Sequence, residues 1–334
     1  MEVHDMFGEK AAIPSGATIV FLGDSITDDG TYISYLDAHF HIHRPEVRLN
    51  LINLGVSSET ASGLSEPAHP FPRPCIFDRL DRALAESEPD IVVVCYGMND
   101  GIYYPLGEER FEAYRAGMRR LLRTIRASGA QAIAVTPPPF DPVSFERAAE
   151  RLRPADAAEF SYDKPYEDYE SVLKAYAEWV MTLDESRADG VVNIHDPMLA
   201  WIREARAADP GCRTGDGIHP NAQGHRVIAR TLLAGLFGET AAEAPADGAP
   251  VDAAPADEAG PVGAAADRDA AVGGTAAYPL VWERHRLLSA AWKEHVGHTN
   301  VTKAPNALPL AEAQARAIEL EERIRELVAA GRAE

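Results

Sequence analysis

Residues 17–25 read ATIVFLGDS, an apolar run that ends abruptly in glycine, aspartate and serine. A short apolar run bounded by turn residues is typical of a strand buried on both faces. Four further segments share this pattern: RLNLINL at 48–54, IVVVCY at 91–96, QAIAVT at 131–136 and VVNIH at 191–195. Helical patterns separate and follow them, at 31–42, 76–87, 108–127, 165–183, 197–207 and 221–236. This alternation predicts a doubly wound α/β fold whose parallel sheet is covered by helices on both faces.

The 334-residue chain carries 32 Lys and Arg against 52 Asp and Glu, a formal charge of −20. An acidic protein repels phosphate backbones and gains nothing from anionic membrane surfaces, so we expect neither nucleic acid nor membrane as a partner. Eight of the acids and a single base lie at 239–272, a stretch that also holds 14 Ala and four Pro. Because it has too little apolar surface to offset its ordering entropy, we expect a flexible linker at 238–277.

This linker divides the expected architecture into an α/β domain at 1–237 and a helical C-terminal extension at 278–334. Residues 279–296 and 310–329 carry apolar side chains at roughly helical spacing, which is typical of helices that dock on their own domain. The three cysteines give no disulfide framework, and the N-terminus lacks the pattern of a signal peptide. No segment approaches the ~18 apolar residues of a membrane span, so we expect a cytoplasmic protein.

Chemically useful side chains follow the predicted strands, at the edge where ligands bind in doubly wound sheets. They are Ser25 after the first strand, Gly55 after the second, Asn99 after the third, and Asp216 and His219 before the last helix of the α/β domain. A serine beside a base is the arrangement used in nucleophilic catalysis, and an aspartate three residues before a histidine can fix the imidazole tautomer. Taken singly, each residue has an ordinary alternative role, such as helix capping for the serine or turn formation for the glycine and asparagine. Their occurrence together favours catalysis.

These segments, in this order, resemble the GDSL/SGNH hydrolase family. The matching residues are Gly23-Asp24-Ser25-Ile26, Gly55, Gly97-Met98-Asn99-Asp100 and Asp216-Gly217-Ile218-His219. The resemblance covers roughly residues 15–237 and is strongest to bacterial carbohydrate esterases, which often deacetylate sugars. It implies a flavodoxin-like sheet of five parallel strands in the order 2-1-3-4-5.

By position, the resemblance implies that Ser25 is the nucleophile, His219 the base and Asp216 its orienting partner. It also implies an oxyanion hole formed by the N–H groups of Ser25 and Gly55 and the side-chain amide of Asn99. The sequence contains no phosphate-binding loop, dinucleotide fingerprint or zinc-ligand spacing, so we expect neither a cofactor nor a metal.

The sequence departs from the family pattern at two positions. Ile26 stands where the motif name has Leu, and Ser58 stands where many members have Gly, so the resemblance does not fix the conformation of the loop at 55–60. Asp24, beside the nucleophile, is one candidate for contacting substrate. Six residues near the strand ends are further candidates, and for each of them core packing is at least as strong an alternative: His69, Phe71, Arg73, Tyr103, Tyr104 and Phe140.

Three functions fit this sequence. The first is a cofactor-free serine esterase acting on small esters, chiefly acetyl esters, including those of carbohydrates. The second keeps the same site but is a lysophospholipase or acyl-thioesterase, which needs a wide apolar groove. The third is a binding module that retains the fold without turnover, and the complete set of catalytic residues argues against it. The expected partner is a small-molecule ester, and a homo-oligomer is left open.

Overall fold

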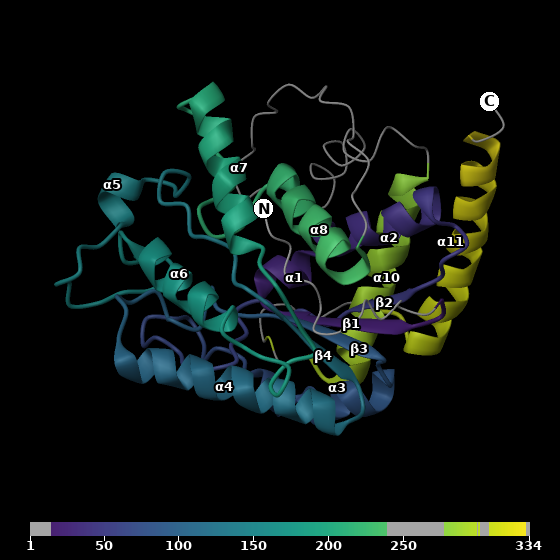
Figure 1. Cartoon of the computed structure of the whole chain (residues 1–334), viewed down its shortest axis with the longest axis horizontal. Coiled ribbons are helices and arrows are strands. Elements are labelled where there is room, and N and C mark those ends of the chain that lie inside the picture. Colours follow the sequence, from purple (N-terminus) through teal and green to yellow (C-terminus); the bar gives the residue numbers. More distant parts are fainter. Residues whose placement is uncertain (1–14, 239–276, 299, 301–306, 332–334) are drawn as a thin grey trace.

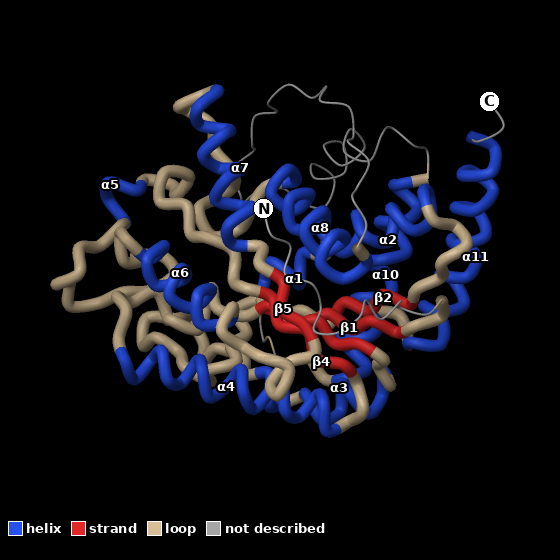
Figure 2. Tube along the Cα trace, viewed as in Figure 1, coloured by secondary structure: helices blue, strands red, loops and turns tan. Residues whose placement is uncertain are grey.

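The sheet has five parallel strands in the order β2-β1-β3-β4-β5, as the family resemblance implies (Figures 1 and 2). The computed structural model describes residues 15–238, 277–298, 300 and 307–331. Its strands are β1 (Thr18–Gly23), β2 (Asn50–Asn53), β3 (Ile91–Cys95), β4 (Gln131–Val135) and β5 (Gly190–Val192). Its helices are α1 (Ser25–Asp29), α2 (Thr31–His43), η1 (Ile76–Asp78), α3 (Leu80–Ser87), α4 (Glu108–Ala127), α5 (Ala148–Arg151), α6 (Tyr169–Val180), α7 (His195–Ala208), α8 (Ala222–Phe237), α10 (Tyr278–Val296) and α11 (Leu310–Gly331).

The predicted strands all form, and the helices differ from prediction mainly at their ends. The pattern at 76–87 divides into η1 and α3, and the pattern at 165–183 shortens to α6. The predicted linker at 238–277 lies, apart from its two terminal residues, outside the described part of the chain. Helix ends depend on local caps and loops rather than on apolar spacing, which is why periodicity places them only approximately.

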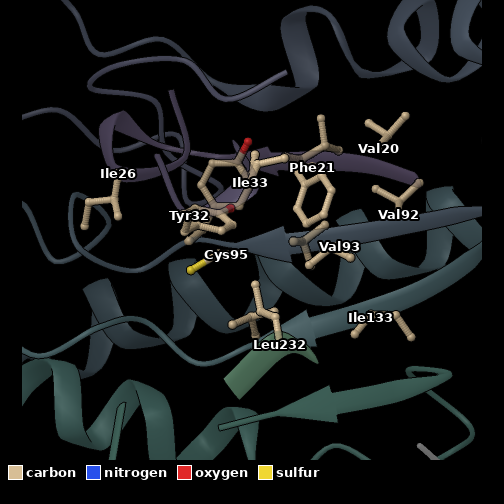
Figure 3. Packing of buried hydrophobic residues seen from close by; sticks show 14 of the residues in the cluster. Val20, Phe21, Ile26, Tyr32, Ile33, Val92, Val93, Cys95, Ile133 and Leu232 are labelled. Atoms are coloured by element: carbon tan, nitrogen blue, oxygen red, sulfur yellow. The ribbon is translucent and has the colours of Figure 1, made fainter. Parts of the chain in front are cut away.

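The core is centred on β3, the middle strand, and on its neighbour β1. Every residue of β3 is buried, as its uninterrupted β-branched sequence predicts. Figure 3 shows Phe21 of β1, Val93 of β3 and Leu232 of α8 within this core. Burial of each such side chain contributes roughly 1.5–3 kcal/mol to folding, so the sheet is the stable frame on which the loops rest.

Helices cover both faces of the sheet, and a further helix, α10, covers the β2 edge. Helices α3 and α4 lie on one face, while α2, α7 and α8 lie on the other (Figure 1). Helix α10 packs against the edge strand β2 and contacts α2 and α3, and α11 packs on α10. An uncovered edge strand would present unpaired backbone groups, so α10 protects this side of the sheet.

The strand register brings the carboxyl ends of β1, β2 and β3 to one edge. Phe21 pairs with Asn53, and Gly23 pairs with Cys95. The segments that follow these strands therefore lie next to one another, as expected for a parallel sheet. Within the described ranges, no helix is both long and apolar enough to cross a membrane.

Candidate active site

Ser25 begins α1 directly after the end of β1. The side chain of Asp24 caps this helix, with its Oδ1 accepting the Ile26 N–H at 3.0 Å. A Cβ on Gly23 would lie 2.2 Å from Thr27 Oγ1, so the position before the cap has no space for a side chain. The chain therefore passes from strand to helix in a tight turn that presents Ser25 at the edge of the sheet.

The loop before α8 brings an imidazole to Ser25. His219 Nε2 lies 2.8 Å from Ser25 Oγ, and His219 Nδ1 lies 2.8 Å from Asp216 Oδ2. The other oxygen of Asp216 accepts the N–H groups of Ile218 and His219 at 2.9 and 2.6 Å. Gly217, with φ of +100°, allows the tight turn that folds this aspartate back onto the histidine. With Nδ1 donating to Asp216, Nε2 is left as the acceptor for the serine hydroxyl.

The contacts among Ser25, His219 and Asp216 shift two pKa values: that of His219 is raised and that of Asp216 is lowered. Partial desolvation lowers the pKa of His219, but the hydrogen bond and negative charge of Asp216 outweigh it and leave the pKa above its ordinary value. Burial opposes ionisation of Asp216, but the bonds from His219 and the backbone lower its pKa to about 2. Burial raises the pKa of Asp24 to about 7. Two carboxyl groups with very different pKa values thus lie near one base.

The backbone donors expected for an oxyanion hole differ in their availability. The Gly55 N–H already donates to Asn53 Oδ1 at 2.9 Å, so it is engaged within the protein. Ser58, in the same loop, has φ of +67°, and its N–H donates to no acceptor in the described part of the chain. Asn99 Nδ2 donates to the Glu59 carbonyl at 3.3 Å, which leaves its second hydrogen for a ligand.

Two buried ion pairs hold the loop that follows β2, and sequence reasoning missed this role for all four residues. Arg79 makes two hydrogen bonds of 2.7 Å to Glu59. Arg73 makes bonds of 2.6 and 2.7 Å to Glu66 and also donates to the Ser58 carbonyl at 3.3 Å. Both pairs are at most 1% exposed in their side chains. Charged residues in loops are normally solvated, so no sequence pattern marked them.

The structure corrects the role expected for two aromatic residues. Tyr103 and Phe140 are each 1% exposed and pack against Tyr169, so neither ring has a face available to a substrate. Core packing was the alternative for both, and it prevails because the loops after β3 and β4 fold inward. The Tyr103 hydroxyl donates to Asn99 Oδ1 at 3.1 Å and so helps to orient that side chain. Arg73, another candidate, is likewise buried in its ion pair.

The remaining aromatic candidates keep part of their surface exposed. His69 contacts the rings of Phe71 and Tyr162, with centroid separations of 4.5 and 5.5 Å. Tyr104 packs against Phe160 at 4.9 Å. His69, Phe71 and Tyr104 are all half-buried, and their contact with a substrate stays a prediction.

The hollow beside His219 is small. Pro139, Trp201 and Ile218 are among its lining residues, and its volume is about 10 Å³, room for about one water-sized group. A larger pocket of about 370 Å³ lies away from Ser25, between α2, α10 and α11. The described residues contain no group of three or more His, Cys, Asp or Glu side chains that could hold a metal ion.

Comparison with known proteins assigns the family. The profile of the GDSL-like lipase/acylhydrolase family matches residues 21–227, which is more than half of the chain. The chain belongs to this family. It is therefore a carboxylic ester hydrolase. The family match includes Ser25, Asp216 and His219, and it ends before α10.

Individual relatives of this GDSL-like hydrolase are distant. A curated acetylxylan esterase from Geobacillus stearothermophilus is 23% identical over 242 residues, which cover 66% of this chain and 94% of that protein. A solved structure of a catalytic mutant of an acetylxylan esterase from the same organism is 20% identical, with a TM-score of 0.48, and covers 68% and 96% of the two chains. The solved structure of a gut microbial diltiazem-metabolizing enzyme matches with a TM-score of 0.53 and 22% sequence identity. The match covers 69% of this chain but only 49% of that enzyme. This last similarity supports the fold alone.

Proposed function

We propose that this hydrolase is a serine esterase that removes small acyl groups, chiefly acetyl, from carbohydrate esters. The observation that carries the proposal is the 2.8 Å contact between Ser25 Oγ and His219 Nε2, with the far ring nitrogen held by Asp216. The curated acetylxylan esterase supports a sugar ester as substrate.

The proposed reaction follows from the orientation of His219. Nε2 takes the proton of Ser25 Oγ as that oxygen attacks the ester carbonyl. The imidazolium then gives this proton to the departing alcohol, and Asp216 stabilises the charge without accepting the proton. Water, deprotonated in turn by His219, attacks the acyl-serine and releases the acid. The substrate is a small-molecule ester, and no step draws on a cofactor.

Three donors are proposed to hold the negative oxygen of the tetrahedral intermediate. They are the Ser25 N–H at the start of α1, the second amide hydrogen of Asn99, and an N–H from the loop after β2. For the last we favour Ser58 over Gly55, because the Gly55 N–H is bound to Asn53 and the Ser58 N–H has no acceptor among the described residues. Donors fixed in advance cost no reorganisation during the reaction.

Labelling with a fluorophosphonate probe tests the nucleophile. We expect the wild type and the matched control Ser171→Ala, at an exposed serine of α6, to be labelled and active. Ser25→Ala should be neither labelled nor active, with a loss of kcat of about 10⁴-fold or more, because the oxygen proposed to form the acyl-enzyme is gone. Labelling that survives Ser25→Ala would sink the proposal.

A substrate series tests the acyl group. Acetyl, butyryl and octanoyl esters of one alcohol, together with acetylated xylo-oligosaccharides, should give the highest kcat/KM for the acetyl compounds. A preference for octanoyl would favour the lysophospholipase or acyl-thioesterase alternative. Tight binding of the oligosaccharides without turnover would favour the binding module.

A further inference from the structure

Helix α10 lies outside the residues matched by the family, yet it packs against β2 and forms an ion pair with Asp28 of α1, the helix that carries Ser25. Figure 1 shows it running past the β2 edge of the sheet, from α2 towards α3. Strand β2 leads into the loop at 54–60, and the residues at the C-terminal end of α10 reach α1. The contacts at these two places are specific and buried.

The carboxylate of Asp28 joins three parts of the molecule. It lies on α1, three residues after Ser25, and its Oδ1 is 2.5 Å from Lys293 Nζ of α10. Its Oδ2 accepts the hydroxyl of Ser57, from the loop after β2, at 2.5 Å. The side chains of Lys293 and Asp28 are only 8% and 12% exposed. A buried carboxylate needs such partners, because desolvation of an unpaired charge is costly.

The C-terminal segment also binds the backbone of the same loop and of β2. Asn300 Nδ2 donates to the Ser57 carbonyl at 2.6 Å, and Ser289 Oγ donates to the Asn53 carbonyl at 3.1 Å. Asn53 in turn donates from Nδ2 to the Thr27 carbonyl of α1 at 2.8 Å. The contacts therefore connect the start of the loop, its middle and the nucleophile helix.

The approach of α10 to α1 is close. A Cβ on Gly30, the residue that ends α1, would lie 2.6 Å from His285 Nε2. Burial lowers the pKa of His285 to about 4, so its ring is neutral near pH 7. On its other side, α10 is tied to α2 by Arg284, whose Nη1 lies 3.1 Å from Asp37.

We propose that α10 is part of the catalytic machinery, with Lys293 as a positioning residue that fixes the loop at 54–60 relative to Ser25 through Asp28 and Ser57. This inference rests on the proposed function, since it concerns the same nucleophile and oxyanion donors. A five-residue helix such as α1 is too short to be stable by itself, so its position depends on its neighbours. A displacement of about 1 Å between nucleophile and oxyanion donors can cost about 100-fold in rate.

Lys293→Met tests this role, with Arg286→Met as the matched control. Both changes remove one positive charge from α10, but Arg286 is exposed and Lys293 is buried against Asp28. We expect Lys293→Met to lower kcat about 10- to 100-fold, with KM within about twofold of the wild type. Lys293→Arg, which keeps the charge, should recover part of the loss, and Arg286→Met should behave as the wild type.

Hydrogen exchange provides a readout that does not depend on turnover. In Lys293→Met, the amides of residues 25–30 and 53–60 should exchange faster, while those of β3 and β4 keep their wild-type rates. If Lys293→Met does not fold, Asn300→Ala takes its place, because it removes the side-chain amide that donates to the Ser57 carbonyl. That variant should show the same pattern, with a loss of kcat of about tenfold.

The outcomes separate this inference from the proposed function. The inference is overturned if Lys293→Met matches Arg286→Met in both kcat and exchange, or if exchange rises uniformly over the whole chain. The proposed function fails instead if the wild type hydrolyses no ester and Ser25→Ala changes nothing. In that case the exchange pattern alone decides whether Lys293 holds the loop.

Discussion

His219 stands between two carboxyl groups of unlike character. Asp216 touches it directly, and its lowered pKa of about 2 keeps it ionised near neutral pH. Asp24 makes no hydrogen bond to the ring, but when ionised, above its pKa of about 7, its negative charge also raises the pKa of His219. Because a general base must be neutral to accept a proton, activity should depend on both groups through the pH at which His219 loses its proton.

Removal of the Asp216 charge should move the pH profile. In the wild type, kcat/KM should rise with pH through an apparent pKa above 6.5, because Asp216 stabilises the imidazolium. Asp216→Asn should shift this pKa downwards and lower kcat by about 10⁴-fold, since an amide no longer holds the correct tautomer. Hydrolysis rates measured from pH 5 to 10 would check both effects. An unshifted profile would show that His219 is not the titrating base.

Asp24 has two effects, a hydrogen bond that caps α1 and a charge that acts on His219, and a substitution can remove the charge while keeping the cap. Asp24→Asn keeps an oxygen that can accept the Ile26 N–H, so α1 should retain its cap. The loss of negative charge should still lower the pKa seen in kcat/KM, by less than Asp216→Asn does. The same pH series measures the shift. An upward shift would mean that Asp24 acts through something other than its charge.

The side-chain amide of Asn99 is the donor whose removal is simplest to interpret. Asn99→Ala should lower kcat by about 10²–10³-fold with little change in KM, the usual cost of losing one oxyanion donor. Tyr103→Phe keeps the amide but removes its 3.1 Å hydrogen bond, so its effect should be much smaller. Steady-state kinetics on both variants, with folding checked by circular dichroism, would test this order. Near-normal turnover in Asn99→Ala would remove this residue from the oxyanion hole.

Among the elements, the loop after β2 is the most constrained by packing. A Cβ on Gly55 would lie 2.4 Å from the Asp28 N and 2.6 Å from the Thr27 carbonyl carbon, so the loop lies directly on α1. Gly55→Ala should therefore destabilise the protein by about 1–3 kcal/mol, as overpacking usually does. Gly331→Ala, where a Cβ would meet nothing within 4 Å, is the control and should leave the melting temperature nearly unchanged. Equal melting temperatures for the two variants would contradict this packing.

The strands could be predicted from the sequence, and the detailed roles of the loops could not. Apolar β-branched runs such as 91–96 have few ways to bury both faces, so periodicity and composition suffice for β3. The engagement of the Gly55 N–H by Asn53 depends on side-chain orientation, which no spacing encodes. The inward packing of Tyr103 and the burial of Arg79 against Glu59 likewise depend on contacts between distant segments. The strand-end positions of Ser25 and His219 were therefore predictable, their catalytic roles stay predictions, and the supporting residues emerged only from the structure.

On the scale of the whole molecule, the two ends of the described chain share one core. Tyr278 and Val281 of α10 are buried together with side chains from the sheet. Tyr278 stacks on Tyr35 of α2, with ring centroids 5.6 Å apart, and its hydroxyl lies 3.0 Å from Ser34 Oγ. The edge strand β2 is thus covered by a helix encoded more than 200 residues later, so the C-terminal extension and the α/β domain fold into one unit.

Cleavage of the chain between the α/β domain and the C-terminal extension tests whether the two parts hold together by their own contacts. A recognition site for a specific protease, placed between residues 239 and 276, would divide the chain without altering a described residue. The two pieces should still elute together from a sizing column, because burial of Tyr278, Val281 and Val296 contributes roughly 1.5–3 kcal/mol for each side chain. The same cut in a Val281→Asp variant should release the C-terminal piece, since it places an unpaired charge in the core. Separation of the unsubstituted pieces under native conditions would show that α10 does not hold the edge of the sheet by its own contacts.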